Sequence, residues 1–343
     1  MPEYDDGHGA RNGIATPDAA SMKRRTFVAG AGAAAVGATF DAGTADARET
    51  SGGAAHGRND ASPAIIAHRG YAGVYPENTV GAVAAASRGG RSDDAATRGA
   101  DMIEIDVVPT GDGDVVVFHD SRLSERDGGE RGLTDESGVV WETPTDVVTS
   151  AEVLRSGETV PLLTDVLDAI PPSVDVNVEF KNPGSFDLEF ASKLSGEALE
   201  AQKDVWRPFT EDVLAIVDDY QNDVLVSSFY EAALATVREQ STLPVAPLLW
   251  DSITDGLDIA RTYDAEAVHP PYNMIQDTPF YADSYYTEGS DWADVDLLAV
   301  AHEEGRDVNV YTLGTWFQAE RLAAAGVDGL IADYPGLLGF GAR

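Results

Sequence analysis

Short apolar runs bounded by turn residues alternate with longer amphipathic segments along most of this chain. From residue 63 onward the apolar runs have the length of buried strands, and most segments between them show helical spacing. This alternation predicts a parallel sheet covered by helices. The predicted strands are 64–67, 102–108, 115–118, 174–180, 224–229, 245–250, 265–269, 308–312 and 329–332, and the predicted helices are 79–88, 162–170, 187–202, 209–220, 230–239, 253–262, 294–305 and 315–325.

One pair of predicted strands cannot be parallel neighbours. Only the stretch PTGDGD separates 102–108 from 115–118, whereas a parallel connection needs about a dozen residues or more. The pair therefore predicts a hairpin, whose turn is supported by Gly111 and Gly113. Without the return strand eight strands remain, which predicts an α/β fold, a (β/α)8 TIM barrel with an extra hairpin strand at its mouth.

Polar and charged residues stand at the predicted carboxyl ends of several strands, where barrels of this kind carry their chemistry. The hairpin adds one from further along the chain, because antiparallel pairing about its turn places His119 opposite Ile105. We therefore expect two histidines, two cations and three carboxylates to meet at the barrel mouth. They are His68, Arg69, Glu104, Asp106, His119, Glu179 and Lys181.

The three carboxylates predict a metal site. Glu104 and Asp106 lie two residues apart on a strand, so both side chains face the same side. Carboxylates that converge on one place are costly unless a proton or a cation lies between them. Together with Glu179 they form an all-oxygen set suited to one divalent cation, Mg²⁺ or Ca²⁺. Zinc is less expected because the chain has no cysteine and no His-rich spacing.

The same set of residues indicates chemistry on a phosphodiester. A divalent cation with Arg69 and Lys181 would neutralise an anionic group of oxygens, as phosphoryl transfer requires. Two histidines can act as base and acid near neutral pH. The sequence has no glycine loop of the nucleotide-binding type and no evident Ser–His–Asp arrangement.

Several motifs in sequence order resemble those of the glycerophosphodiester phosphodiesterases, from about residue 63 to residue 338: AHRG, PENT, EIDV, VVVFHD, VEFK and DGLIADYP. The resemblance implies a phospholipase C-like barrel that hydrolyses glycerophosphodiesters to glycerol phosphate and an alcohol through a cyclic phosphate. It implies that Glu104, Asp106 and Glu179 bind the metal, and that His68 and His119 are the catalytic pair. Which histidine acts first as base stays open.

The resemblance also implies that Arg69 and Lys181 contact the phosphate. Asn78, in PENT, either positions the site or caps the helix that begins near Thr79. Alternatives within the superfamily are a phospholipase D-like enzyme or another phosphodiester or lipid hydrolase. An alternative of a different class is a secreted barrel that binds glycerophosphate groups without turnover.

The chain departs from the family pattern near its last crossover. Where the family usually has a WTVN-like stretch, this chain has VYTLGT, with Tyr311 in the aromatic position and Gly314 where Asn is common. Tyr311 either packs in the core or stacks on the substrate. His269, which ends a strand at the same mouth, is a candidate for lining the pocket. These departures concern substrate preference more than activity.

The composition is strongly acidic. The formal net charge is −36, and four of the 23 basic residues are lysine. Such a chain repels nucleic acid and anionic membranes, so a small-molecule substrate is the expected partner, and the oligomeric state stays open. Because the acids are spread between apolar runs, the pattern favours adaptation to high salt, where cations screen the self-repulsion, and it resembles haloarchaeal proteins.

The first sixty residues lack the barrel pattern. The stretch KRRTFVA precedes a weakly apolar run and a small-x-small site at Ala45-Asp46-Ala47, which resembles a twin-arginine export signal. Met22 is a second candidate for the start. The apolar run is too short to span a bilayer stably, so we expect an exported protein without a stable membrane anchor. A cytoplasmic protein with a basic patch is the alternative.

This gives the following predicted organisation: a signal region at 1–47, a flexible linker at 48–62, and a single phosphodiesterase domain at 63–343 with insertions near 121–160 and 270–292.

Overall fold

The structure is a computed structural model that describes residues 62–88, 99–126, 132–283 and 289–338 of the 343-residue chain. The predicted signal region, and all but the last residue of the predicted linker, lie outside the described residues. Within the described part, no helix is long and apolar enough to cross a bilayer.

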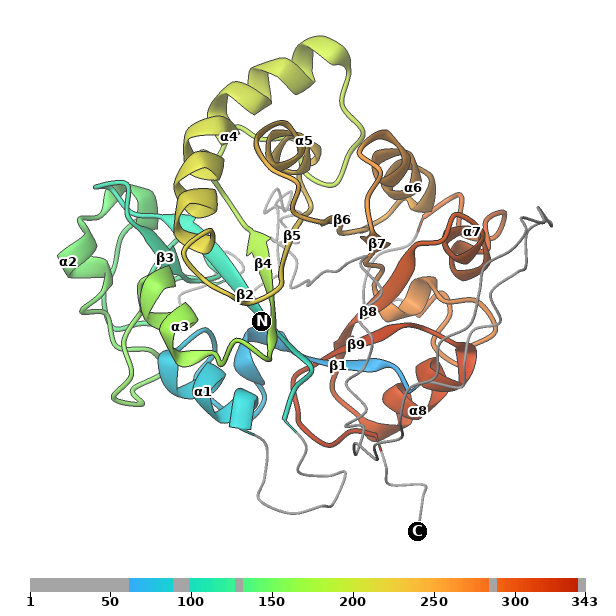
Figure 1. Ribbon diagram of the computed structural model, residues 1–343, viewed down its shortest axis with the longest axis horizontal. Coiled ribbons are helices and arrows are strands. Elements are labelled where there is room, and N and C mark those ends of the chain that lie inside the picture. Colours follow the sequence, from blue (N-terminus) through green and yellow to red (C-terminus); the bar gives the residue numbers. More distant parts are fainter. Residues whose placement is uncertain (1–61, 89–98, 127–131, 284–288, 339–343) are drawn as a thin grey trace, which may run out of the picture.

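Eight parallel strands form a nearly closed barrel surrounded by helices, as the alternating pattern predicts (Figure 1). They are β1 (Ala64–Ala67), β2 (Met102–Pro109), β4 (Asp175–Phe180), β5 (Val224–Ser228), β6 (Val245–Pro247), β7 (Ala267–Val268), β8 (Asp307–Leu313) and β9 (Gly329–Ala332). Neighbours follow the order β6-β5-β4-β2-β1-β9-β8-β7. A parallel bridge between Leu248 and His269 brings β6 against β7. All eight carboxyl ends therefore open at one mouth.

The helices on the outside of the barrel match the predicted segments, with one correction. They are α1 (Val80–Arg88), α3 (Leu163–Ala169), α4 (Gly196–Val217), α5 (Glu231–Gln240), α6 (Ile253–Thr262), α7 (Leu297–Glu303) and α8 (Trp316–Ala325). The predicted helices 187–202 and 209–220 were wrong as separate elements, because a single helix, α4, begins at Gly196 and continues through Pro208. Proline removes a backbone hydrogen bond, but Trp206 and Phe209 on either side are buried against the barrel and hold the helix together.

The predicted hairpin is confirmed in its register. Strand β3 (Val115–Val117) pairs antiparallel with β2, with Val107 opposite Val117 and Val108 opposite Val116. One more backbone hydrogen bond follows, from the Phe118 N–H to the Asp106 carbonyl, at 2.9 Å. The next residue, His119, is therefore returned to the level of the β2 carboxylates.

The described residues of the insertion at 121–160 contain helices and a core, where a charged loop was predicted. The insertion contains a 3-10 helix at Val140–Glu142 and the short helix α2 (Thr145–Val148), and α2 lies beside β3 in Figure 1. Its apolar side chains bury a small second core against the outer face of the hairpin. That core is Val108, Val116, Phe118, Leu123, Leu133, Val140, Val148, Ala151, Val153 and Val160. The insertion thus supports the strand that delivers His119.

Candidate active site

The turn after β1 places two polar side chains in the barrel mouth. Arg69 and Gly70 both have positive φ, 50° and 74°, and a Cβ on Gly70 would lie 2.9 Å from Ala82. Glycine is therefore required where this turn approaches α1. The turn directs the Arg69 N–H to Glu104 Oε2, at 2.8 Å, and leaves His68 at the mouth.

Three buried carboxylates from adjacent strands form one group. Asp106 on β2 stands opposite Glu179 on β4, and one oxygen from each of these residues and from Glu104 lies within 4.8 Å of the others. Among the described residues, Glu104 Oε1 and Glu179 Oε2 have no hydrogen-bond partner. Buried carboxylate oxygens without partners are costly, so this all-oxygen set fits a bound divalent cation.

The environment of these carboxylates opposes their ionisation. Burial raises the pKa of Glu104 well above its usual value, and the negative charges of Asp106 and Glu179 raise it further. Burial also raises the pKa of Glu179 to about 8, although Lys181 acts in the opposite direction. Burial therefore favours proton binding by Glu104 and Glu179, and a bound cation would compete with those protons and favour the ionised carboxylates.

Two basic side chains partly neutralise the carboxylates. Lys181 Nζ lies 2.6 Å from Glu179 Oε1 and 3.3 Å from Asp106 Oδ1, and Arg69 Nε lies 3.0 Å from Asp106 Oδ2. Three ionised carboxylates against two cations leave one negative charge. A divalent cation would turn this into one positive charge, which suits a phosphodiester monoanion.

Asn78 holds Asp106 in place. Its side-chain Nδ2 donates to Asp106 Oδ2 at 2.8 Å, and its Oδ1 accepts from the Asp106 N–H at 3.3 Å. The helix cap is supplied by its neighbour instead, because Thr79 Oγ1 accepts from the Ala82 N–H at 3.2 Å. Of the two interpretations of Asn78, the geometry favours positioning over capping.

Each histidine at the mouth is held through Nδ1 by a carboxylate. His68 Nδ1 lies 2.6 Å from Asp333 Oδ1, and His119 Nδ1 lies 2.7 Å from Asp120 Oδ1. A carboxylate at Nδ1 fixes the ring and leaves Nε2 as the nitrogen for proton transfer. The sequence reasoning missed both aspartates, although Asp333 directly follows β9, Asp120 lies three residues after β3, and each stands within a motif of the family, DGLIADYP or VVVFHD.

A basic residue from the insertion links the two parts of the site. Arg126 contacts both oxygens of Glu77, at 2.6 and 3.0 Å, and its Nε lies 3.0 Å from Asp120 Oδ2. Glu77 Oε1 in turn accepts from Arg69 Nη1 at 2.7 Å. Burial raises the pKa of Asp120 to about 6, even though Arg126 lowers it. The sequence reasoning missed Arg126, because nothing separates it from the other charges of the insertion.

A pocket of about 540 Å³ opens beside these groups. It is lined by His68, Arg69, Glu77 and Asp333, together with residues of the turn after β1, of the stretch after β7, and of β8, α8 and the connection between them. Those further lining residues are Ala72, Gly73, Tyr272, Thr312, Gly314 and Gln318. Gly314, where the family usually has Asn, therefore forms part of the pocket wall.

Two predicted pocket residues lie within the barrel interior and not among those lining residues. Tyr311 is fully buried, its hydroxyl donates to the Leu249 carbonyl, and its ring meets the edge of Phe229. This placement favours packing over substrate stacking. His269 is also fully buried, with Nε2 3.2 Å from Asn309 Nδ2, and burial lowers its pKa well below the usual value.

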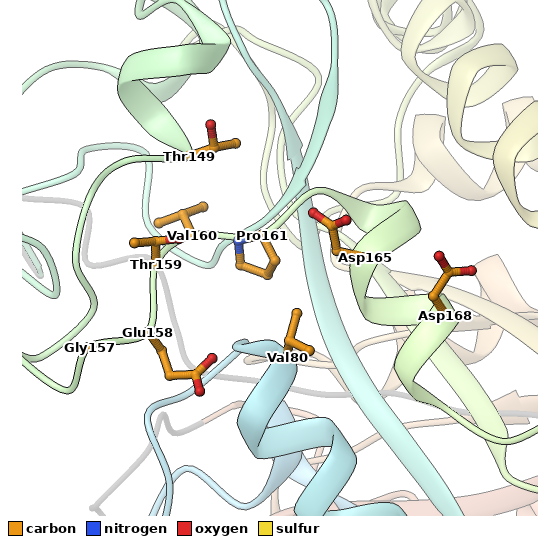
Figure 2. A pocket seen from close by; sticks show the side chains of 9 residues that line it. All are labelled: Val80, Thr149, Gly157, Glu158, Thr159, Val160, Pro161, Asp165 and Asp168. Carbon is orange, nitrogen blue, oxygen red and sulfur yellow. The ribbon is translucent and has the colours of Figure 1, made fainter.

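A second pocket, of about 480 Å³, lies outside the barrel and carries none of these groups (Figure 2). Its acidic side chains come from α3 and from the end of the insertion, and two of them serve the local backbone. Glu158 accepts from the Gly81 N–H at 3.3 Å, and Asp165 accepts from the Leu162 N–H at 3.2 Å. The groups suited to catalysis are therefore those at the barrel mouth and not those of this second pocket.

Comparisons with known proteins match the part of the chain that forms the barrel. The model of the glycerophosphoryl diester phosphodiesterase family matches residues 68–337. A glycerophosphodiester phosphodiesterase of Bacillus altitudinis is 26% identical over 282 residues, which cover 79% of this chain and 94% of that protein. A glycerophosphodiester phosphodiesterase of Caldanaerobacter subterraneus is 27% identical over 276 residues, which cover 79% of this chain and 94% of that protein.

Solved structures show the same fold. A phosphodiesterase of Oleispira antarctica in complex with the product sn-glycerol-3-phosphate superimposes with a TM-score of 0.58 at 22% identity, covering 80% of this chain and 94% of that one. A glycerophosphoryl diester phosphodiesterase of Silicibacter pomeroyi gives a TM-score of 0.58 at 25% identity, covering 80% and 91%.

Proposed function

The chain belongs to the glycerophosphodiester phosphodiesterase family and is an enzyme of that activity, and we propose that it uses one divalent cation and two histidines to release glycerol phosphate and an alcohol. The observation that carries this proposal is the convergence at one mouth of two histidine–carboxylate pairs and three buried carboxylates. A small glycerophosphodiester is the substrate.

The carboxylate group is the proposed metal site. Glu104, Asp106 and Glu179 would hold Mg²⁺ or Ca²⁺, which when bound supplies electrophilic polarisation of the phosphoryl oxygens. Lys181 remains beside two of these carboxylates and fixes their orientation. Arg69, which reaches both the carboxylates and the pocket, binds the phosphate.

The proposed reaction has two steps. In the first, one histidine takes the proton of the glycerol 2-hydroxyl, whose oxygen forms a bond to phosphorus. The phosphorus–oxygen bond to the alcohol breaks, and the other histidine gives the departing oxygen a proton. In the second, water opens the resulting cyclic phosphate while the histidines exchange roles. His68 and His119 suit this exchange because a carboxylate holds each ring through Nδ1.

Release of glycerol phosphate from glycerophosphocholine, with and without a chelator, tests the proposal. We expect turnover that is lost with the chelator and restored by Mg²⁺ or Ca²⁺. If the protein binds glycerophosphocholine but releases no glycerol phosphate with either cation, the non-catalytic barrel is the better account. Turnover that is insensitive to the chelator would exclude the metal site.

We further propose that the enzyme is exported and works at high salt. The twin-arginine-like stretch and the net charge of −36 support this. Thermal unfolding should occur at a higher temperature as KCl is raised, because counterions screen the repulsion between surface carboxylates. N-terminal sequencing of the secreted protein would show whether cleavage follows Ala47.

A further inference from the structure

Four aromatic rings run without a break from the pocket wall to the protein surface. Tyr272 lines the pocket that also contains His68. Its ring centroid lies 5.8 Å from that of Phe280, which lies 5.6 Å from Phe317, which lies 5.9 Å from Trp316. Contacts at these distances are normal edge-to-face packing, so the rings form one continuous apolar path.

The outer end of this path faces solvent. Tyr272 is 6% exposed, whereas Phe317 is 38% exposed and Trp316 is 49% exposed. Exposed aromatic groups that continue from a polar pocket mark a binding groove more often than scattered single residues do. The path is also fixed in position, because Thr315 and Gln318 form a capping box at the start of α8 and Gln318 lines the pocket.

Another aromatic ring, from the connection after β9, lies against Gly73, a pocket-lining residue of the turn after β1. Tyr334 follows Asp333, the partner of His68, and is 41% exposed. Its ring covers Gly73, where a Cβ would lie 2.4 Å away. The opening beside the catalytic groups is therefore bordered by apolar rings from both the β9 and the α8 connections.

A deacylated glycerophosphodiester is too small and polar to account for these rings. A hydrocarbon chain that leaves the phosphodiester would pass from the pocket directly onto Tyr272 and then outward. The proposed reaction needs a free glycerol 2-hydroxyl, so the substrate can carry a chain at the glycerol 1-position but not a second chain at the 2-position. The net charge of −36 disfavours an anionic bilayer as the occupant.

We propose that the aromatic path binds the acyl chain of monoacyl glycerophosphodiesters, so that lysophospholipids are substrates of the same active site. This inference rests on the proposed function. It adds a hydrophobic subsite that discriminates between substrates by chain length, formed by Tyr272, Phe280, Phe317 and Trp316.

The test compares glycerophosphocholine with a homologous series of short-chain 1-acyl-glycerophosphocholines, kept below the concentration at which they aggregate. We expect kcat/KM to rise along the series, by up to about fourfold for each methylene that is fully buried. A flat series, with glycerophosphocholine itself turned over, would overturn the subsite and leave the proposed function intact. No turnover of any substrate in the presence of Mg²⁺ or Ca²⁺ would overturn both.

Two matched variants separate the path from general surface hydrophobicity. Trp316→Ala should lower the kcat/KM ratio of the longest acyl substrate to glycerophosphocholine by about fivefold to tenfold. Phe186 is 61% exposed and packs on Trp141 away from the pocket, so Phe186→Ala should leave this ratio unchanged. An equal fall in both variants, or none in Trp316→Ala, would contradict the assignment.

The other possible occupant of the aromatic path is a hydrocarbon chain carried by the leaving alcohol. A parallel series of glycerophosphoesters of simple alkanols tests it, because there the chain belongs to the leaving alcohol. A rise in kcat/KM confined to that series would overturn the assignment to the acyl chain. A rise in the acyl series that Trp316→Ala reduces supports it.

Discussion

The two histidines of the active site are held by the same contact but by different parts of the molecule. His68 follows β1 and pairs with Asp333 after β9, its neighbouring strand in the barrel. His119 follows β3, outside the ring of eight strands, and pairs with the adjacent Asp120. The Nδ1–carboxylate distances are 2.6 Å for His68 and 2.7 Å for His119.

The surroundings of the two aspartates differ. The side chain of Asp333 is 31% exposed, whereas that of Asp120 is 6% exposed and forms an ion pair with Arg126 of the insertion. The barrel itself therefore fixes one histidine–aspartate pair, and the insertion supports the other. We propose that the insertion contributes to catalysis through Arg126, which contacts both Asp120 beside His119 and Glu77 beside Arg69, and this can be tested.

The largest effect on kcat should come from removing the imidazole ring of either His68 or His119. His68→Ala and His119→Ala should each lower kcat on the order of 10²–10⁴-fold, because each removes a proton-transfer group. Steady-state release of glycerol phosphate measures this, and circular dichroism confirms the fold. If one variant keeps a near-normal rate, the two histidines do not share the chemistry as proposed.

Replacing either aspartate should have a smaller effect on kcat, and the pH–rate profiles of the two variants should differ. Asp120→Asn should lower kcat by about 10–100-fold, because the ring loses the carboxylate that orients it. Burial raises the pKa of Asp120 to about 6, and the ionised form is the one that supports His119, so the rate should fall as pH falls through about 6. The acid limb of the Asp120→Asn profile should be shallower than that of the parent enzyme, because only the ionisation of the histidine base remains to produce it.

Asp333→Asn is the matched control for that profile. It should lower kcat as well, since it removes the partner of His68, but it leaves Asp120 in place and should keep the acid limb as steep as in the parent enzyme. If the limb stays as steep in Asp120→Asn and becomes shallower in Asp333→Asn, the two environments have been assigned the wrong way round.

The smallest effect should come from replacing Arg126, the residue of the insertion that contacts Asp120 and Glu77. Arg126→Ala should lower kcat by about tenfold with little change in KM, since it loosens Asp120 and Glu77 without touching the substrate. Arg126→Lys should recover only part of the rate, because lysine cannot contact both oxygens of Glu77 in the same way. The exposed ion pair of Arg122 with Glu125 offers a control, and Arg122→Ala should behave like the parent enzyme.

Much of the architecture could be predicted from the sequence because short-range rules fix it. The spacing of apolar runs gave the order of the strands, and the short turn after Pro109 set the register that brings His119 to the mouth. Because successive side chains of a strand point to opposite faces, Glu104 and Asp106 could likewise be predicted to lie together.

The parts that were missed depend on contacts between segments far apart in the chain. Helix α4 continues through Pro208 only because the barrel packs against its aromatic face. Arg126 is one of several charges in the insertion, and its partner Glu77 lies 49 residues away. Such choices of partner are tertiary, so no local pattern marks them.

The most direct test of the account is a comparison of glycerophosphocholine with its 2-deoxy analogue, followed by phosphorus NMR in the presence of Mg²⁺ or Ca²⁺. With glycerophosphocholine, a cyclic phosphate should appear and then convert to glycerol phosphate, while the analogue, which lacks the attacking hydroxyl, should stay intact. Cleavage of the analogue at a comparable rate would contradict the proposed attack by the 2-hydroxyl and would point instead to direct attack by water.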